Sequence, residues 1–99
     1  MAKQKRPKAG TLQEWARGFA LLSDPTRLGI LQVLAKGPKN VTALCKILKL
    51  KQPAVSHHLG LLRMGRIVIS KRQGRSVLYA SDKAALKTLA SGLVKLMPR

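Results

Sequence analysis

The stretch QPAVSHHL, residues Gln52–Leu59, has the pattern of a helix that docks on a core and presents its other side to a partner. Pro53 suits the first turn of such a helix, because proline lacks the backbone N–H that would find no intrahelical acceptor there. At about 100° per residue, one side groups Val55, His58, Leu59 and Leu62. The opposite side groups Ser56, His57 and Gly60, with Arg63 at its edge. Small and hydrogen-bonding groups on one face are what a helix entering the major groove of DNA requires.

Outward from this stretch, apolar spacing and turn signals predict five helices and one β-hairpin. The β-branched run Ile67–Ile69 and the turn signal Gln73-Gly74 indicate the hairpin. The expected elements are helices over about 11–22, 25–36, 41–49, 52–64 and 82–97, with strands near 67–69 and 77–79. The order α-α-α-α-β-β-α, mainly α with a small β-hairpin, is that of a winged helix-turn-helix.

The polar residues at the expected helix starts have the chemistry of N-caps. Thr11 and Glu14 have the capping-box spacing, and Asp24 precedes Pro25 at the start of the second helix. Asn40 can cap the third helix, and Asp82 opens the last one. In the second helix, the residues expected to face the core are Leu28, Leu31 and Leu34 or Ala35.

The chain is strongly basic, with 20 Lys and Arg against 3 Asp and Glu and a net charge of +17 over 99 residues. This length predicts one small domain, over residues 11–97. Residues 1–10, MAKQKRPKAG, carry four cations and are expected to form a flexible basic arm. Because the acids stand at helix starts, little opposes the basic surface, and double-stranded DNA is the expected partner. The alternative is that the charge only keeps the protein soluble.

Nothing in the sequence indicates a membrane protein. A membrane span needs about eighteen consecutive apolar residues, and no such run is present. Residues 1–8 are basic without an apolar segment behind them, so no signal peptide is expected. The single Cys45 cannot form an internal disulfide, which suits a reducing cytoplasm.

The polar residues of the 52–64 helix and of the hairpin divide into two kinds of expected DNA contact. Ser56 and His57, with Gln52 near the helix start, are expected to read bases. The cations expected to hold phosphates are Lys51, Arg63, Lys71, Arg72 and Arg75. The arginines at the hairpin tip could also enter the minor groove.

Three blocks of sequence, taken together, resemble the ArsR family of bacterial and archaeal repressors. They are LSDPTRLGIL, QPAVSHHLGLLR and KRQGRSVLY, residues 22–31, 52–63 and 71–79, in the order and spacing of that family. The resemblance covers about residues 19–82. It implies a homodimer, paired through the first and last helices, that binds an inverted-repeat operator and leaves it when an inducer binds. It also implies that each recognition helix enters a major groove while each wing reaches toward the minor groove.

Apolar residues on the first and last helices fit such a dimer. The residues predicted for its interface are Leu12, Trp15, Phe19, Leu86, Leu89 and Leu93. Any one of them could belong to the monomer core, but as a set they are too much apolar area for an exposed surface.

The chain departs from the family pattern at the recognition helix. Lys51 stands where the family usually has a small hydroxyl residue, and lysine cannot cap a helix. His57 and Gly60 occupy positions that are commonly basic in the family. Glycine weakens a helix interior by about 1 kcal/mol relative to alanine. It could let the helix approach DNA closely, so the base preference is expected to differ from that of relatives.

The metal sites common in this family lack their ligands here. Only Cys45 matches a family cysteine position in the third helix, where Asn40 and Thr42 replace the other thiols. The last helix has one acid and no histidine. Adjacent His57 and His58 point about 100° apart on a helix and cannot chelate one ion. Since Zn²⁺ takes about four ligands, we expect no metal and no cofactor, although an inducer of another kind stays open.

Two other function classes compete with a dimeric repressor. The high charge would also suit a nonspecific or architectural nucleic-acid-binding protein, which bulk DNA would titrate away from any one site. A protein-interaction module docking an acidic partner is the third reading, although it would not demand basic groups on both helix and wing. No carboxylate pair, phosphate-binding glycine loop or nucleophile with a base is apparent, so an enzyme is not expected.

Overall fold

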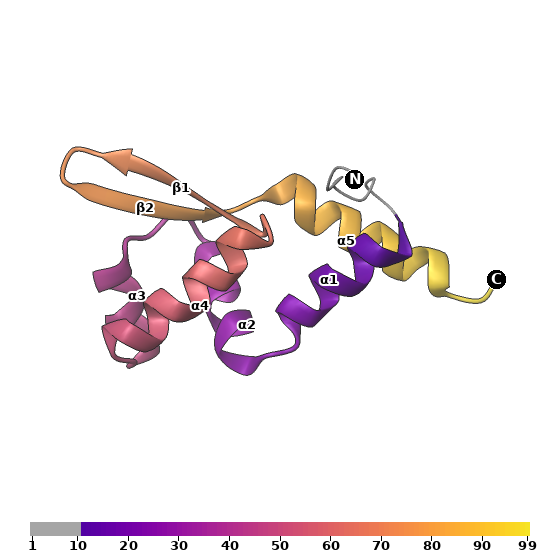
Figure 1. The fold of residues 1–99 in the computed structure, drawn as a ribbon, viewed down its shortest axis with the longest axis horizontal. Coiled ribbons are helices and arrows are strands. Elements are labelled where there is room, and N and C mark those ends of the chain that lie inside the picture. Colours follow the sequence, from indigo (N-terminus) through magenta and orange to yellow (C-terminus); the bar gives the residue numbers. More distant parts are fainter. Residues whose placement is uncertain (1–10) are drawn as a thin grey trace, which may run out of the picture.

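The computed structural model describes residues 11–99, and the predicted arm at 1–10 lies outside the described residues. The elements are α1 (Leu12–Leu22), α2 (Pro25–Leu34), α3 (Val41–Leu48), α4 (Gln52–Met64), β1 (Val68–Gln73), β2 (Ser76–Ser81) and α5 (Lys83–Leu96). This order confirms the predicted winged helix-turn-helix. In Figure 1 the β1–β2 hairpin extends over the end of the molecule that holds α3 and α4, whereas α1 and α5 lie together at the opposite end.

Local capping chemistry explains where four of the helices begin. The N-cap side chains of α1, α2, α3 and α5 are Thr11, Asp24, Asn40 and Asp82, and each accepts a backbone hydrogen bond. The shortest joins Asn40 Oδ1 to the backbone N of Ala43 at 2.8 Å. Helix α4 differs, because Lys51 at its N-cap makes no side-chain bond to the helix. The amides of the first turn of α4 are therefore not capped by this side chain.

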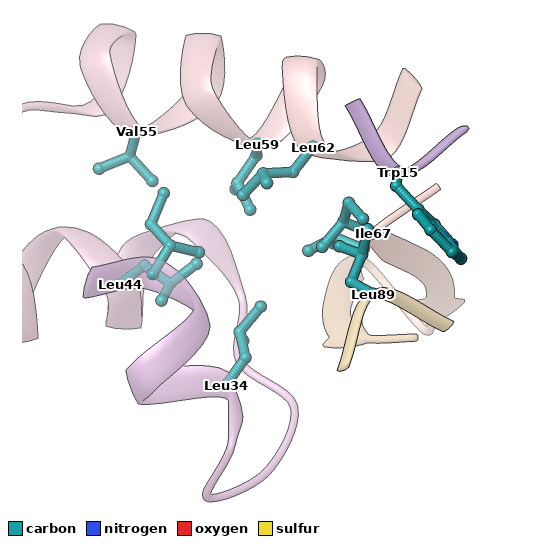
Figure 2. Close-up of a cluster of buried hydrophobic side chains, with 10 residues drawn as sticks. Trp15, Leu34, Leu44, Val55, Leu59, Leu62, Ile67 and Leu89 are labelled. Carbon is teal, nitrogen blue, oxygen red and sulfur yellow. The ribbon is translucent and has the colours of Figure 1, made fainter. Parts of the chain in front are cut away.

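The core lies under the inward face of α4. Val55, Leu59 and Leu62 are buried and point toward Leu44 of α3 and Leu34 of α2 (Figure 2). Ile67 and Leu89 continue the buried cluster toward Trp15 of α1. Burying a side chain of this size contributes about 1.5–3 kcal/mol. Packing against the core therefore fixes which face of α4 is turned outward.

The expected inward face of α2 was wrong at one position. Leu28 is 50% exposed, whereas Ile30 is fully buried and Leu31 is half-buried. The buried stripe follows Arg27, Ile30, Leu31 and Leu34, which have helical i, i+3, i+4, i+7 spacing. Apolar spacing alone favours Leu28 as the first member of this face, because the residue that actually begins the stripe is a half-buried arginine.

The hairpin strands are longer than the predicted runs, and Ile67 lies just before β1. Gln73 pairs with Ser76, and Gly74 in the turn between them has a positive φ of 62°, a region that favours glycine. The base of the hairpin is joined to the segment before α3. Lys39 and Tyr79 exchange two backbone hydrogen bonds of 3.0 and 2.8 Å. This pair anchors β2 beside the helix-turn-helix.

Two glycines allow α1 and α5 to pack closely. A Cβ on Gly18 would overlap Leu89, and a Cβ on Gly92 would lie 2.8 Å from Trp15 Cδ2. Both large side chains are consequently buried within the chain itself. The six residues predicted for the dimer interface therefore divide into three pairs: Trp15 and Leu89 buried, Phe19 and Leu86 half-buried, Leu12 and Leu93 exposed.

Candidate nucleic-acid interface

The outward face of α4 is polar and exposed. Gln52, Ser56 and His57, the predicted base readers, are all exposed, as is Lys51 at the N-cap. Behind them, Val55 and Leu59 are buried, so the helix cannot rotate without exposing its apolar face. The result is a rigid helix that offers hydroxyl, amide and imidazole groups to a partner.

His58 joins α4 to the start of α2. Its Nδ1 lies 3.2 Å from a terminal nitrogen of the Arg27 guanidinium and 3.9 Å from Asp24 Oδ2. Because a guanidinium can only donate, Nδ1 is the acceptor at the Arg27 contact. The Nε of Arg27 also donates to the carbonyl of Leu21 at 2.7 Å. These contacts connect the end of α1, the start of α2 and the middle of α4.

His58 was predicted to lie on the inward face of its helix, but its partnership with Arg27 was not predicted. Its side chain is 19% exposed, so it lies at the edge of the core. Arg27 is 31 positions away in the chain. The one available signal was a cation on the buried stripe of α2, where a polar partner is needed.

Asp24 is held ionised by its role as a cap. The backbone N–H of Arg27 donates to Asp24 Oδ2 at 3.0 Å, and this hydrogen bond lowers the pKa of the carboxyl below its ordinary value of 3.8. Partial desolvation of the carboxyl opposes this shift, and the charge of the Arg27 guanidinium adds to it. Negative charge at this helix start is also favoured by the helix dipole.

The β1–β2 hairpin is the wing, and its tip carries a second group of exposed cations. Lys71 and Arg72 lie near the end of β1 and Arg75 lies in the turn, and all three are exposed. Lys71 lies opposite Leu78, and Arg72 lies opposite Val77. Successive residues of a strand point to opposite faces, so Lys71 and Arg72 lie on opposite faces of the hairpin near its tip. Arg63, the remaining predicted phosphate contact, is exposed in the last turn of α4.

Two cations near the helix-turn-helix turn were not predicted. Lys46 is exposed in the last turn of α3, and Lys49 is exposed just after it. Lys49 has a left-handed backbone with φ 57°, which ends α3 and redirects the chain into α4. Lys49 is two residues before Lys51 in the chain, so both lysines flank the turn between α3 and α4. Both lysines were predicted to lie in the third helix, 41–49, and neither was assigned a DNA contact.

Potential metal ligands are scattered among the described residues. No group of three or more His, Cys, Asp or Glu side chains gathers within residues 11–99. Cys45 is half-buried in α3, and the rings of His57 and His58 meet edge to face at 5.4 Å. These donors do not fit a closed zinc site within one chain. The expectation that no metal is needed stays a prediction.

Comparison with known proteins identifies the family. The sequence model described as "Bacterial regulatory protein, arsR family" matches residues 24–70, which run from the cap of α2 into β1. A helix-turn-helix transcriptional regulator of Mycobacterium tuberculosis is 35% identical over 83 residues, covering 84% of this chain and 78% of that protein. The chain belongs to the ArsR family. The family model and the curated relatives that match this ArsR-family chain are regulators of transcription.

Solved structures support the same assignment for the fold of this ArsR-family chain. An ArsR-like transcriptional regulator from a Rhodococcus species has a TM-score of 0.80 and 33% identity, covering 88% of this chain and 82% of that one. The homodimeric winged helix-turn-helix DNA-binding domain of a possible ArsR-family regulator from Mycobacterium bovis has a TM-score of 0.74 and 29% identity. That comparison covers 96% of this chain and 89% of the other.

Some curated relatives of this ArsR-family protein are longer. A protein named as a homolog of the transcriptional repressor SmtB, from Synechocystis, is 37% identical over 81 residues. The match covers 79% of this chain but only 61% of that relative.

The described residues contain no helix long and apolar enough to cross a membrane.

Proposed function

We propose that this ArsR-family regulator is a repressor that binds an inverted-repeat operator as a homodimer. The observation that carries the proposal is the arrangement of α4 and the wing. The outward face of α4 is polar while its inward face is locked in the core, and the wing extends over the same end of the molecule (Figure 1). A recognition helix for the major groove and a basic wing for adjacent phosphates would both be available at that end.

The charge distribution supports DNA as the ligand. None of the three acids lies in α4 or the wing, because Glu14, Asp24 and Asp82 stand at the starts of α1, α2 and α5. The DNA-facing elements therefore combine cations with uncharged polar groups. We assign Gln52, Ser56 and His57 to base reading. The cations assigned to phosphates are Lys51, Arg63, Lys71, Arg72 and Arg75. A protein that acts on chromosomal DNA in this way belongs in the cytoplasm.

The proposed dimer rests on the exposed side of the α1–α5 pair. Leu12 is 72% exposed and Leu93 is 55% exposed, and Leu96 and Met97 are also exposed at the end of α5. Large exposed apolar side chains that gather on one surface are typical of an interaction site. In addition, Nε1 of buried Trp15 has no hydrogen-bond partner among residues 11–99. A second subunit packed here would bury Leu12 and Leu93, with Phe19 and Leu86 at the margin, over Trp15 and Leu89. The homodimeric Mycobacterium bovis neighbour favours this assembly.

We also propose that operator binding needs no metal. This part rests on the donor set, because neither α3 nor α5 supplies a histidine and α3 supplies one thiol. The inducer, if it is a small molecule, would then be recognised by other chemistry.

Selection of DNA from a random duplex library tests the repressor proposal. Selection at physiological salt with excess bulk DNA should yield one inverted repeat whose half-site centres are about 10–10.5 base pairs apart. The selected site should resist competition by bulk DNA at about a thousandfold excess. A protein that enriches no sequence and is titrated away by bulk DNA would instead be the architectural binder. The matched variant Ser56→Ala with His57→Ala, which keeps every cation, should lose the sequence preference but retain nonspecific binding.

A further inference from the structure

We propose that Gly60 and Met64 of α4 form a seat for the C5-methyl group of a thymine in the major groove. The proposal rests on the proposed function and adds to it a specificity-determining contact. Gly60 has no side chain to offer, so its role would be to leave space that the methyl group occupies.

Packing inside the protein does not explain this glycine. A Cβ on Gly18, Gly65 or Gly92 would approach another side chain closely, which accounts for glycine at those positions. A Cβ on Gly60 would meet nothing within 4 Å. Its φ is not positive either, so its backbone conformation does not require glycine. Glycine in a helix interior is destabilising, and neither close packing nor backbone conformation requires it at Gly60.

The space beside Gly60 is a hollow on the surface of α4. Gly60, Arg63 and Met64 line it together. Residues three and four positions apart are neighbours on a helix surface, so Gly60 lies between His57 on one side and Arg63 and Met64 on the other. The hollow therefore continues the exposed face that carries the proposed base readers.

The lining of the hollow favours a methyl group over a polar base edge. Met64 is 83% exposed, and its flexible thioether supplies an apolar wall. Gly60 supplies no side-chain donor, so a purine N7 or O6 placed against Gly60 and Met64 would lose its hydrogen bonds to water unless Arg63 turned inward from the border. Thymine presents the one apolar group of the major groove. Arg63 at the border can hold the neighbouring phosphate.

The test combines a protein variant with a DNA analogue. The probe is the site selected by the wild-type protein, with each thymine of the half-site replaced in turn by deoxyuridine, which lacks only the methyl group. At one thymine, the replacement should weaken the affinity of the wild-type protein about fourfold, which corresponds to the free energy of burying one methyl group. Gly60→Ala should bind the unmodified site about tenfold more weakly, since it fills the seat. The deoxyuridine replacement should not weaken Gly60→Ala further and should restore part of its lost affinity, because the added Cβ then occupies the space that the methyl group has left.

Stability measurements separate this result from misfolding. Gly60→Ala should have an equal or higher melting temperature, because alanine is the better helix former. Lys87→Ala, at an exposed position of α5, is the control and should change neither the DNA affinity nor the thymine preference. The inference is overturned if Gly60→Ala keeps full affinity, or if every deoxyuridine replacement weakens both proteins equally. If the wild-type protein selects no site at all, the proposed function fails instead.

Discussion

The guanidinium of Arg27 lies 3.2 Å from Nδ1 of His58 and ties the start of α2 to the middle of the recognition helix. The same side chain reaches back to the carbonyl of Leu21. One half-buried arginine thus links three helices. His57 precedes His58 in α4, so its position depends on this link as well as on the apolar core.

Replacement of Arg27 by alanine is expected to reduce both stability and DNA binding. The variant loses two hydrogen bonds, each contributing about 1 kcal/mol, so the free energy of unfolding should fall by about 1–3 kcal/mol. Urea denaturation measures this loss, and titration of the selected site measures the affinity. Arg17→Ala, which removes an exposed arginine from α1, is the control and should change the stability little. Equal stability of the two variants would contradict the role of Arg27.

Asp24 should make the stability depend on acid pH. Its pKa is lowered in the folded protein, chiefly by the backbone hydrogen bond from Arg27. A lowered folded pKa means that the carboxylate stabilises the fold above its unfolded pKa, and that this contribution is lost as pH falls through the lower folded value. Asp24→Asn keeps a capping group without the charge. The stability advantage of the wild type over Asp24→Asn should therefore shrink below about pH 4. Urea denaturation at a series of pH values measures the free energy of unfolding of both proteins. A difference between the two that stays constant as the pH falls would contradict the expectation.

The dimer prediction concerns the exposed residues Leu12 and Leu93. Sedimentation at micromolar concentration should give about twice the chain mass of 10.8 kDa. Leu12→Glu combined with Leu93→Glu should give a monomer, because charges at the centre of an apolar interface are left without partners. Lys87→Ala on the same helix should remain dimeric. A clean monomer for the wild-type protein would contradict the dimeric operator complex.

Metal ions are expected to leave the DNA complex intact. Zn²⁺, Cd²⁺ or arsenite titrated against a preformed complex at constant ionic strength should not change the affinity. Cys45→Ser should bind DNA nearly as well as the wild type, with a small loss of stability from a hydroxyl at a half-buried position. Stoichiometric metal uptake that shifts operator affinity about tenfold, a coupling of about 1.4 kcal/mol, would restore a metal-sensor role.

The local features of this fold were predictable from sequence. The bounds Gln52–Met64 of α4 and the caps Asn40 and Asp82 agree with the structure. These features depend on residues close together in the chain: proline at a helix start, a capping side chain and helical apolar spacing. The side chain of Lys51 makes no capping bond, as its chemistry predicted.

Contacts between distant segments were not predictable in the same way. The pairing of Lys39 with Tyr79 and the contact of Arg27 with His58 join residues that no local pattern connects. Trp15 shows a related difficulty. An apolar stripe shows that a residue is covered, but not whether its own chain or a second subunit covers it. Here Gly92 allows α5 of the same chain to approach Trp15.

The central claim is that α4 reads bases while the wing holds phosphates, and one pair of variants tests it most directly. Relative affinities for every single-base variant of the selected site should be measured for His57→Ala and Arg72→Ala at several salt concentrations. His57→Ala should change the preference at one or two base pairs. Arg72→Ala should weaken all sequences alike and reduce the salt slope by about one unit. If both variants lose affinity while the base preferences of the wild type persist unchanged, α4 does not read the operator through His57.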